Sequence, residues 1–108
     1  MKWYSKLYVG DSIAGKAGKI KWKIRHRAGT IDIYVISFAS NPENLLDVIP
    51  ANELMQRGYP KKHMKVIGLA KGYEEALQVV ATIIEETYQN TGDVDVWDYL
   101  KEKRRDSL

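Results

Sequence analysis

The chain has 108 residues, which is enough for one domain with a single core but too few for two. Its 44% hydrophobic and 29% charged residues are ordinary for a globular protein and disfavour disorder. No apolar run approaches the roughly 20 residues of a membrane span and no signal peptide is recognisable, so the composition predicts a cytoplasmic protein without membrane contact.

Positive charge is concentrated at the N-terminal end. Residues 1–27 contain eight lysines and arginines against one acid, Asp11, whereas residues 28–108 contain nine against thirteen acids. A basic block of this density is typical of proteins with an anionic partner, although lysine-rich segments also serve only to solvate a surface. The absence of cysteine rules out disulfides and thiolate metal sites.

The first expected element is a strand over residues 3–9, "WYSKLYV", which is aromatic, β-prone and followed by Gly10. The stretch "KIKWKIRHRAG" is ambiguous, because its alternating cations fit a strand of a hairpin with residues 30–38. A helical stripe of apolar residues favours the alternative, a helix between Gly10 and Gly29 with an N-terminal cap at Asp11 or Ser12. The stripe is Ile13, Ala17, Ile20 and Ile24.

Residues 30–38 predict a strand that is covered on both faces, because apolar residues dominate both alternating sets. One set is Ile31, Ile33, Val35 and Ser37, and the other is Asp32, Tyr34, Ile36 and Phe38. "SNPENLLDVI" (residues 40–49) predicts a helix, with Asn41 as cap, Pro42 at the first position and Glu43 in the first turn. After Pro50, a short helical turn is expected to close at Gly58.

"MKVIGLA" (residues 64–70) predicts a short buried strand, and residues 72–92 predict the longest helix. The apolar stripe expected for this helix is Ala76, Leu77, Val80, Ala81, Ile84 and Tyr88. A last, peripheral helix is expected within residues 93–108, capped by Asp93 and anchored by Trp97 and Leu100.

This order predicts a single α/β domain over residues 1–108, with a three-stranded sheet, three to four helices and a β-α-β-α-β-α sequence of elements. Right-handed crossovers would make neighbouring strands parallel. We expect a core that brings together residues of the second and third strands and of the long helix: Ile33, Val35, Val66, Leu69, Leu77, Val80 and Ile84.

Two glycine-containing turns invite a functional interpretation. "GDSIAGKA" (residues 10–17) is one residue away from the phosphate-binding loop G-x-x-x-x-G-K-[ST], but Ala17 lacks the hydroxyl that would hold Mg²⁺. Chance is the favoured explanation, with a loose phosphate contact of Lys16 as the alternative. "GLAKGYEE" (residues 68–75) lies between a strand and a helix, where anions often bind, but its two glutamates favour a simple tight turn.

No catalytic constellation, metal site or cofactor site is predicted. His26 and His63 are the only histidines, and neither has a ligand partner at helical spacing. The basic stretch instead combines phosphate-neutralising cations with a possible stacking ring, the ingredients of nucleic-acid binding. The candidate residues for nucleic-acid or anion binding are Lys16, Lys19, Lys23, Arg27 and Trp22.

Two segments, "SFASNPENLLDVIPANELMQRGYPKK" and "VIGLAKGYEEALQVVATIIEETY", resemble a group of small, uncharacterised single-domain bacterial proteins. The resemblance covers most of residues 1–92. It implies a free-standing bacterial cytoplasmic protein and carries no activity, cofactor or catalytic residue.

The functional expectation is therefore a small binding module rather than an enzyme, with a basic helix that contacts nucleic acid or another anionic partner. The alternative is a protein-interaction or homo-oligomeric structural or regulatory protein, for example a homodimer. A small enzyme is the least favoured interpretation, since active sites assembled from distant residues leave no linear pattern.

Overall fold

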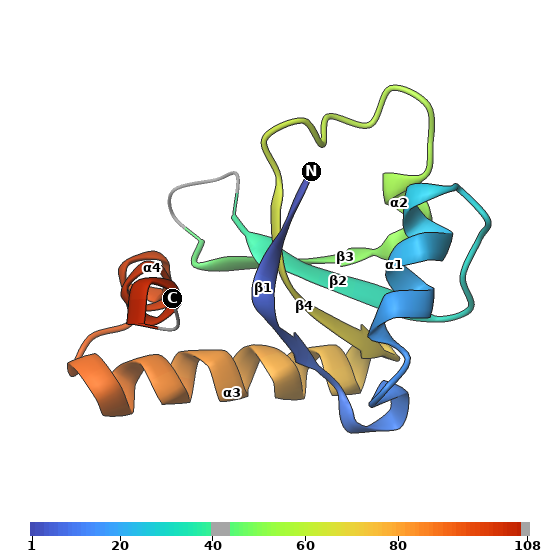
Figure 1. The fold of residues 1–108 in the computed structure, drawn as a ribbon. Coiled ribbons are helices and arrows are strands. Elements are labelled where there is room, and N and C mark those ends of the chain that lie inside the picture. Colours follow the sequence, from blue (N-terminus) through green and yellow to red (C-terminus); the bar gives the residue numbers. More distant parts are fainter. Residues whose placement is uncertain (40–43, 107–108) are drawn as a thin grey trace.

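The computed structural model describes residues 1–39 and 44–106, which form one α/β domain (Figure 1). Its elements in chain order are β1 (Lys2–Val9), the 3-10 turn η1 (Asp11–Ile13), α1 (Ala17–Arg25), β2 (Ile33–Phe38), β3 (Leu46–Pro50), α2 (Ala51–Leu54), β4 (Lys65–Lys71), α3 (Tyr73–Thr91) and α4 (Val96–Asp106). The three strands predicted near residues 3–9, 30–38 and 64–70 are confirmed.

The sheet is mixed and has four strands in the order β1-β4-β2-β3. β1 pairs with β4 in parallel, while β2 runs antiparallel to both of its neighbours, β4 and β3. The expectation of a three-stranded sheet with parallel neighbours is therefore wrong in detail. Because β4 is inserted between β1 and β2, the crossover through α1 joins two strands that are not hydrogen-bonded to each other.

Helices cover both faces of the sheet: α1 and α2 lie on one side, and α3 and α4 on the other (Figure 1). Alternation along β2 sends Ile33 and Val35 toward α1, and Ile36 and Phe38 toward α3, as the strand pattern predicted. The core is consequently divided by the sheet into two apolar clusters. The prediction of one common cluster with α3 is therefore wrong for the four strand residues that are buried on the α1 side: Ile33, Val35, Val66 and Leu69.

Residues 17–25 form a helix, which resolves the ambiguity of "KIKWKIRHRAG" in favour of the helical stripe. Ile13, Ile20 and Ile24 are buried in the α1-side cluster, and their burial outweighs the alternation of the cations. The predicted caps are not used: η1 is a separate turn, and Lys16 precedes the first helical residue without a side-chain cap bond. Gly29 does adopt a positive φ after the helix.

The helix predicted over residues 40–49 is wrong for its second half, because Leu46–Pro50 is strand β3. Its predicted start at Asn41, Pro42 and Glu43 lies outside the described residues. β3 is an edge strand that local propensity did not indicate. It pairs with β2 from Phe38 opposite Leu46 to Tyr34 opposite Pro50. The short turn after Pro50 is α2, and Gly58 has the expected positive φ.

The long helix α3 is rotated relative to the expected stripe. Ala76 is buried as predicted, but Leu77, Ala81 and Tyr88 are exposed, and Val80 and Ile84 are only half-buried. The residues that face the sheet are Ala76, Val79, Ile83 and Thr87. The predicted stripe omitted Thr87 because threonine is polar. Thr87 can be buried because its hydroxyl donates to the Ile83 carbonyl oxygen at 2.8 Å.

The last helix, α4, packs on α3 and is anchored by buried Leu100, as predicted, whereas the other predicted anchor, Trp97, is 42% exposed. Its cap is Asp95 rather than Asp93: the Asp95 carboxylate accepts from the backbone N–H of Asp98 at 3.1 Å. Three elements are tied together through Glu86 of α3, whose Oε2 accepts from the hydroxyls of Tyr8 on β1 and Tyr99 on α4.

Candidate functional site

The predicted basic residues gather in a groove beside α1, which we call the lysine groove. It encloses about 310 Å³ and is lined by Ser12, Ile13, Lys16, Lys19, Ile20, Lys23, Thr30, Ile31, Ile33 and Lys71. Four of these ten residues are lysines and none is acidic. The structure therefore brings together three predicted residues, Lys16, Lys19 and Lys23, and adds a fourth cation from a distant segment.

The spacing along α1 explains this grouping. Lys19 and Lys23 are four residues apart on one face, and Lys16 immediately precedes the helix on the same side. Burial of Ile20 and Ile24 against the sheet leaves these lysines at the rim of the groove. Lys71 is the last residue of β4 and is paired with Ile33 at the start of β2, which places it across the groove from α1.

The floor of the lysine groove is apolar and consists of buried Ile13, Ile20 and Ile33, whereas Ile31 is 85% exposed and lies at the edge of the groove. Ile31 was expected to lie inside the sheet, but β2 begins two residues later at Ile33. The segment before β2 is held by Asn52 of α2, whose side-chain oxygen accepts from both the backbone N–H and the hydroxyl of Thr30 at 2.9 and 2.8 Å. These hydrogen bonds hold the segment that carries exposed Ile31 beside the groove lysines.

The groove lysines of α1 are not neutralised by the acids of α3. Among the side chains described, those of residues 1–39 and 44–101, no carboxylate lies at ion-pair distance from Lys16, Lys19 or Lys23. Only Lys71 has an acid close by, Glu75, and that carboxylate is also engaged elsewhere. The cations on α1 are thus available to an external anion.

Trp22 and Arg27, the other two predicted residues, do not join the lysine groove. Trp22 is 55% exposed on the next face of α1, where its ring stacks on His26 with centroids 4.4 Å apart. Arg27 follows the helix with a φ of 53°. On the same helix, the ammonium of Lys21 lies 5.4 Å from the centroid of the Trp3 ring and does not point into the groove.

The loop that resembles a phosphate-binding loop already holds a carboxylate of the chain itself. Glu75 accepts from the Ser12 hydroxyl at 2.8 Å, from the Ser12 backbone N–H at 3.3 Å and from the Lys71 backbone N–H at 3.0 Å. These hydrogen bonds, that of Lys71 first, hold the pKa of Glu75 below its ordinary value. A β-carbon at Gly10 would lie 2.0 Å from Glu75 Oε1, so the glycine serves this contact.

Backbone hydrogen bonds also occupy the loop amides. The N–H groups of Ile13, Ala14 and Lys16 donate to carbonyl oxygens of the same loop. Phosphate-binding loops need such amides to point at the ligand, which supports the interpretation of the motif as chance. The second turn, at Gly72, has a φ of 84° and begins α3, consistent with the tight-turn interpretation.

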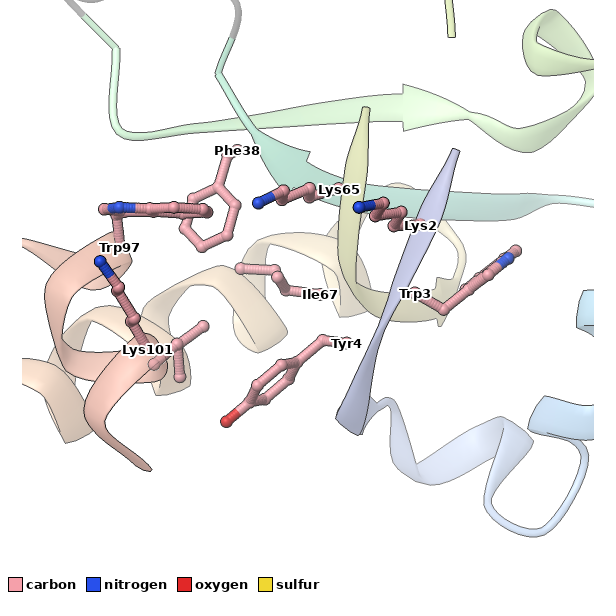
Figure 2. Close-up of a pocket in the computed structure, with 9 residues that line it drawn as sticks. Lys2, Trp3, Tyr4, Phe38, Lys65, Ile67, Trp97 and Lys101 are labelled. Atoms are coloured by element: carbon pink, nitrogen blue, oxygen red, sulfur yellow. The ribbon is translucent and has the colours of Figure 1, made fainter. Parts of the chain in front are cut away.

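A second hollow lies on the other face of the sheet, at the opposite end of β4, and we call it the tryptophan pocket. It encloses about 240 Å³ and is lined by Lys2, Trp3, Tyr4, Phe38, Lys65, Ile67, Trp97, Leu100 and Lys101 (Figure 2). Buried Ile67 and Leu100 supply its apolar interior. Three of its lining residues are lysines and none is an acid.

Trp97 forms one wall of this pocket and is 42% exposed. The edge of its indole meets Phe38, with ring centroids 5.0 Å apart and planes at 79°. The Lys65 ammonium lies 4.1 Å from the centroid of the indole. A cation–π contact at an exposed site contributes only about 0.5–1 kcal/mol, so a ligand can displace it.

Figure 2 shows how the three lysines of the tryptophan pocket are placed. Lys2 and Lys65, from the starts of β1 and β4, extend toward the side where Trp97 lies, and Lys101 rises from α4 beside the indole. Trp3 points to the opposite side of β1, where it packs on the α1-side cluster. The tryptophan pocket could not be predicted from the sequence because its lysines come from three separate elements. The one local signal was an exposed tryptophan, Trp97, on an amphipathic helix.

The tyrosines that donate to Glu86 have raised pKa values. Burial raises the pKa of Tyr99 to about 12, and its hydrogen bond to Glu86 acts in the same direction. Burial and the Glu86 carboxylate also raise the pKa of Tyr8. The cluster joins β1, α3 and α4, so its first role is to hold α4 beside the tryptophan pocket.

His26 and His63 are both exposed. The described part of the chain contains no group of three or more histidine, aspartate or glutamate side chains placed to share a metal ion. It also contains no helix long and apolar enough to cross a membrane.

Comparison with protein-family models, with curated proteins and with solved structures gives no match for this chain. The function must therefore be inferred from the geometry of the two sites.

Proposed function

We propose that this protein is a binding module that holds the phosphate backbone of a single-stranded nucleic acid in the lysine groove. The observation that carries the proposal is the convergence of Lys16, Lys19, Lys23 and Lys71 on a groove whose lining contains no acid. Lysine is a point-charge phosphate ligand, and several such contacts along a groove supply affinity without sequence preference.

The apolar floor favours a single strand over a duplex. In a single strand the sugars and bases are accessible and can bury apolar surface while the phosphates meet the cations at the rim. Exposed Ile31 offers such a surface beside the lysines. A duplex presents its phosphates outward and would leave this isoleucine without a partner.

The salt dependence of binding gives a quantitative test. A single strand that contacts four lysines releases about four counterions, for which the slope of log affinity against log salt is about −0.7 per contact. Between about 50 and 200 mM salt the affinity for a 12-nucleotide RNA or DNA should then fall roughly 50-fold. Fluorescence anisotropy of a labelled strand measures this; an affinity that is insensitive to salt contradicts the proposal.

A matched pair of charge variants assigns the effect to the groove. Replacing Lys16, Lys19 and Lys23 together by glutamine should flatten the salt slope to about −0.7, the share of the remaining lysine. The control replaces three exposed cations outside both sites, Lys6, Arg57 and Lys62, by glutamine. Equal losses in the two variants would show that overall charge, and not the groove, drives binding.

The groove variant should also stay folded. Like charges spaced three or four residues apart on a helix repel by a few tenths of a kcal/mol per pair. Removing them in the absence of a ligand should leave the free energy of unfolding unchanged or slightly higher, as measured by urea unfolding. A clear loss of stability would mean that the three lysines are structural.

A second candidate function, association with another copy of the chain, is favoured by the outer face of α3. Leu77 and Tyr88 lie at helical spacing and are 45% and 60% exposed on the side of α3 that faces away from the sheet. Exposed apolar patches mark protein interfaces. Sedimentation should show a dimer that a Leu77→Glu variant dissociates; a monomer at all concentrations removes this candidate.

A further inference from the structure

We propose that the tryptophan pocket binds a mononucleotide, with the base in the apolar part of the pocket against Trp97 and the phosphate among Lys2, Lys65 and Lys101. This site is separate from the lysine groove. It lies on the opposite face of the sheet and at the other end of β4, so its occupant need not be the strand proposed above.

The interior of the pocket suits a planar ring. Trp97, Phe38 and Tyr4 form aromatic walls around Ile67 and Leu100. Aromatic rings of proteins stack on any nucleobase, because every base has a π-face. The pocket volume of about 240 Å³ lies below the roughly 300–1,000 Å³ of sites that enclose drug-sized ligands, so the pocket has room for one base, with the ribose and phosphate at its opening.

The rim of the pocket suits a phosphate. Lys2, Lys65 and Lys101 come from three different elements and line the pocket, with Lys65 next to the Trp97 ring and Lys2 and Lys101 on opposite sides of it (Figure 2), while none of the residues that line the pocket is acidic. The N-terminal amine is close to the same strand start, where it donates to the Lys62 carbonyl oxygen. A dianionic phosphate would be attracted here, whereas a cationic ligand would be repelled.

Lys65 links the two halves of the proposed ligand. In the free protein its ammonium lies over the Trp97 ring, 4.1 Å from the centroid, on a surface that a base could use. Stacking of a base there displaces a weak cation–π contact and releases the ammonium toward the phosphate. Base and phosphate are therefore expected to bind better together than either does alone.

Isothermal titration calorimetry with adenosine 5′-monophosphate tests this on the full chain. We expect saturable binding with a Kd on the order of 1 mM or tighter, and binding of adenosine or inorganic phosphate that is at least about tenfold weaker. Absence of saturable binding overturns the proposal. So does phosphate binding as tightly as the nucleotide, since it would show an anion site without base recognition.

Variants assign the binding to the pocket. Trp97→Leu should weaken adenosine 5′-monophosphate at least about fivefold, with thermal unfolding as the check that α4 stays in place. The rim variants Lys2→Gln and Lys101→Gln alter exposed side chains, and each should weaken binding about twofold to fivefold. If neither rim variant weakens binding, the proposal fails even when Trp97→Leu does not fold.

The lysine groove supplies the matched control. Lys16→Gln with Lys19→Gln should leave the affinity for adenosine 5′-monophosphate unchanged, because these residues are remote from Trp97. Loss of mononucleotide binding in this control would move the ligand to the lysine groove and overturn the inference. Loss of strand binding in the same variant, with mononucleotide binding intact, would instead support both proposals at separate sites.

Discussion

The rotation of α3 is tested by comparing alanine substitutions at Ile83 and Leu77. Ile83 is completely buried against the sheet, while Leu77 is 45% exposed on the outer face. Truncation of a fully buried isoleucine removes its transfer free energy and leaves a cavity, which together cost about 2–5 kcal/mol. At Leu77 about half of the side chain already meets water and no closed cavity forms, so the cost should stay below about 1 kcal/mol.

Urea unfolding followed by circular dichroism measures both free energies. Thermal unfolding gives a second measurement, because in a domain of this size each kcal/mol shifts the melting temperature by roughly 4–8 °C. Ile83→Ala should therefore lower the melting temperature by about 10 °C or more. Leu77→Ala should be within a few degrees of the parent chain. Equal costs at the two positions would refute the orientation of α3 and restore the stripe expected from the sequence.

Three further predictions concern the contacts that fix the sites. Glu75→Gln should destabilise the fold at neutral pH, and the difference should shrink as pH falls below about 4.5, because a carboxylate whose folded pKa is lowered stabilises only while it is ionised. Gly10→Ala should lower the free energy of unfolding because the added β-carbon displaces the Glu75 carboxylate. In a double-mutant cycle, the variant that combines Gly10→Ala with Glu75→Gln should therefore lose less stability than the sum of the two single losses. Unfolding free energy should fall as pH rises from 10 to about 12, since the raised pKa of Tyr99 favours its neutral form in the folded state, and Tyr99→Phe should weaken that dependence in a pH series of urea titrations.

Local patterns predicted the elements whose apolar residues are arranged with one clear period. The strand at residues 33–38 and the helix at residues 17–25 follow from such patterns, and the buried stripe of α1 decided against the hairpin. The apolar arc of α3 is wide, with Val79, Val80, Ile83 and Ile84 in adjacent pairs. Its centre is set by contact with the sheet, which the helix period alone does not specify.

Strand β3 and the sheet order could not be predicted for a different reason. The segment of residues 46–50 is short, and the Asn-Pro-Glu sequence before it is typical of a helix start. Its strand conformation depends on pairing with β2. Tertiary pairing commonly overrides local propensity in segments of this length. The lysines of α1 could be grouped from helical spacing, but Lys71 enters the groove only through the β2–β4 register.

The most direct test of the central claim is a map of the surface that a single strand contacts. Amide chemical shifts recorded during titration with a 12-nucleotide RNA should change for residues 16–23 and around Lys71, while the outer face of α3 near Leu77 and Tyr88 stays unchanged. Changes confined to the outer face of α3, near Leu77 and Tyr88, or no changes at any strand concentration, would contradict the assignment of the lysine groove as the nucleic-acid site.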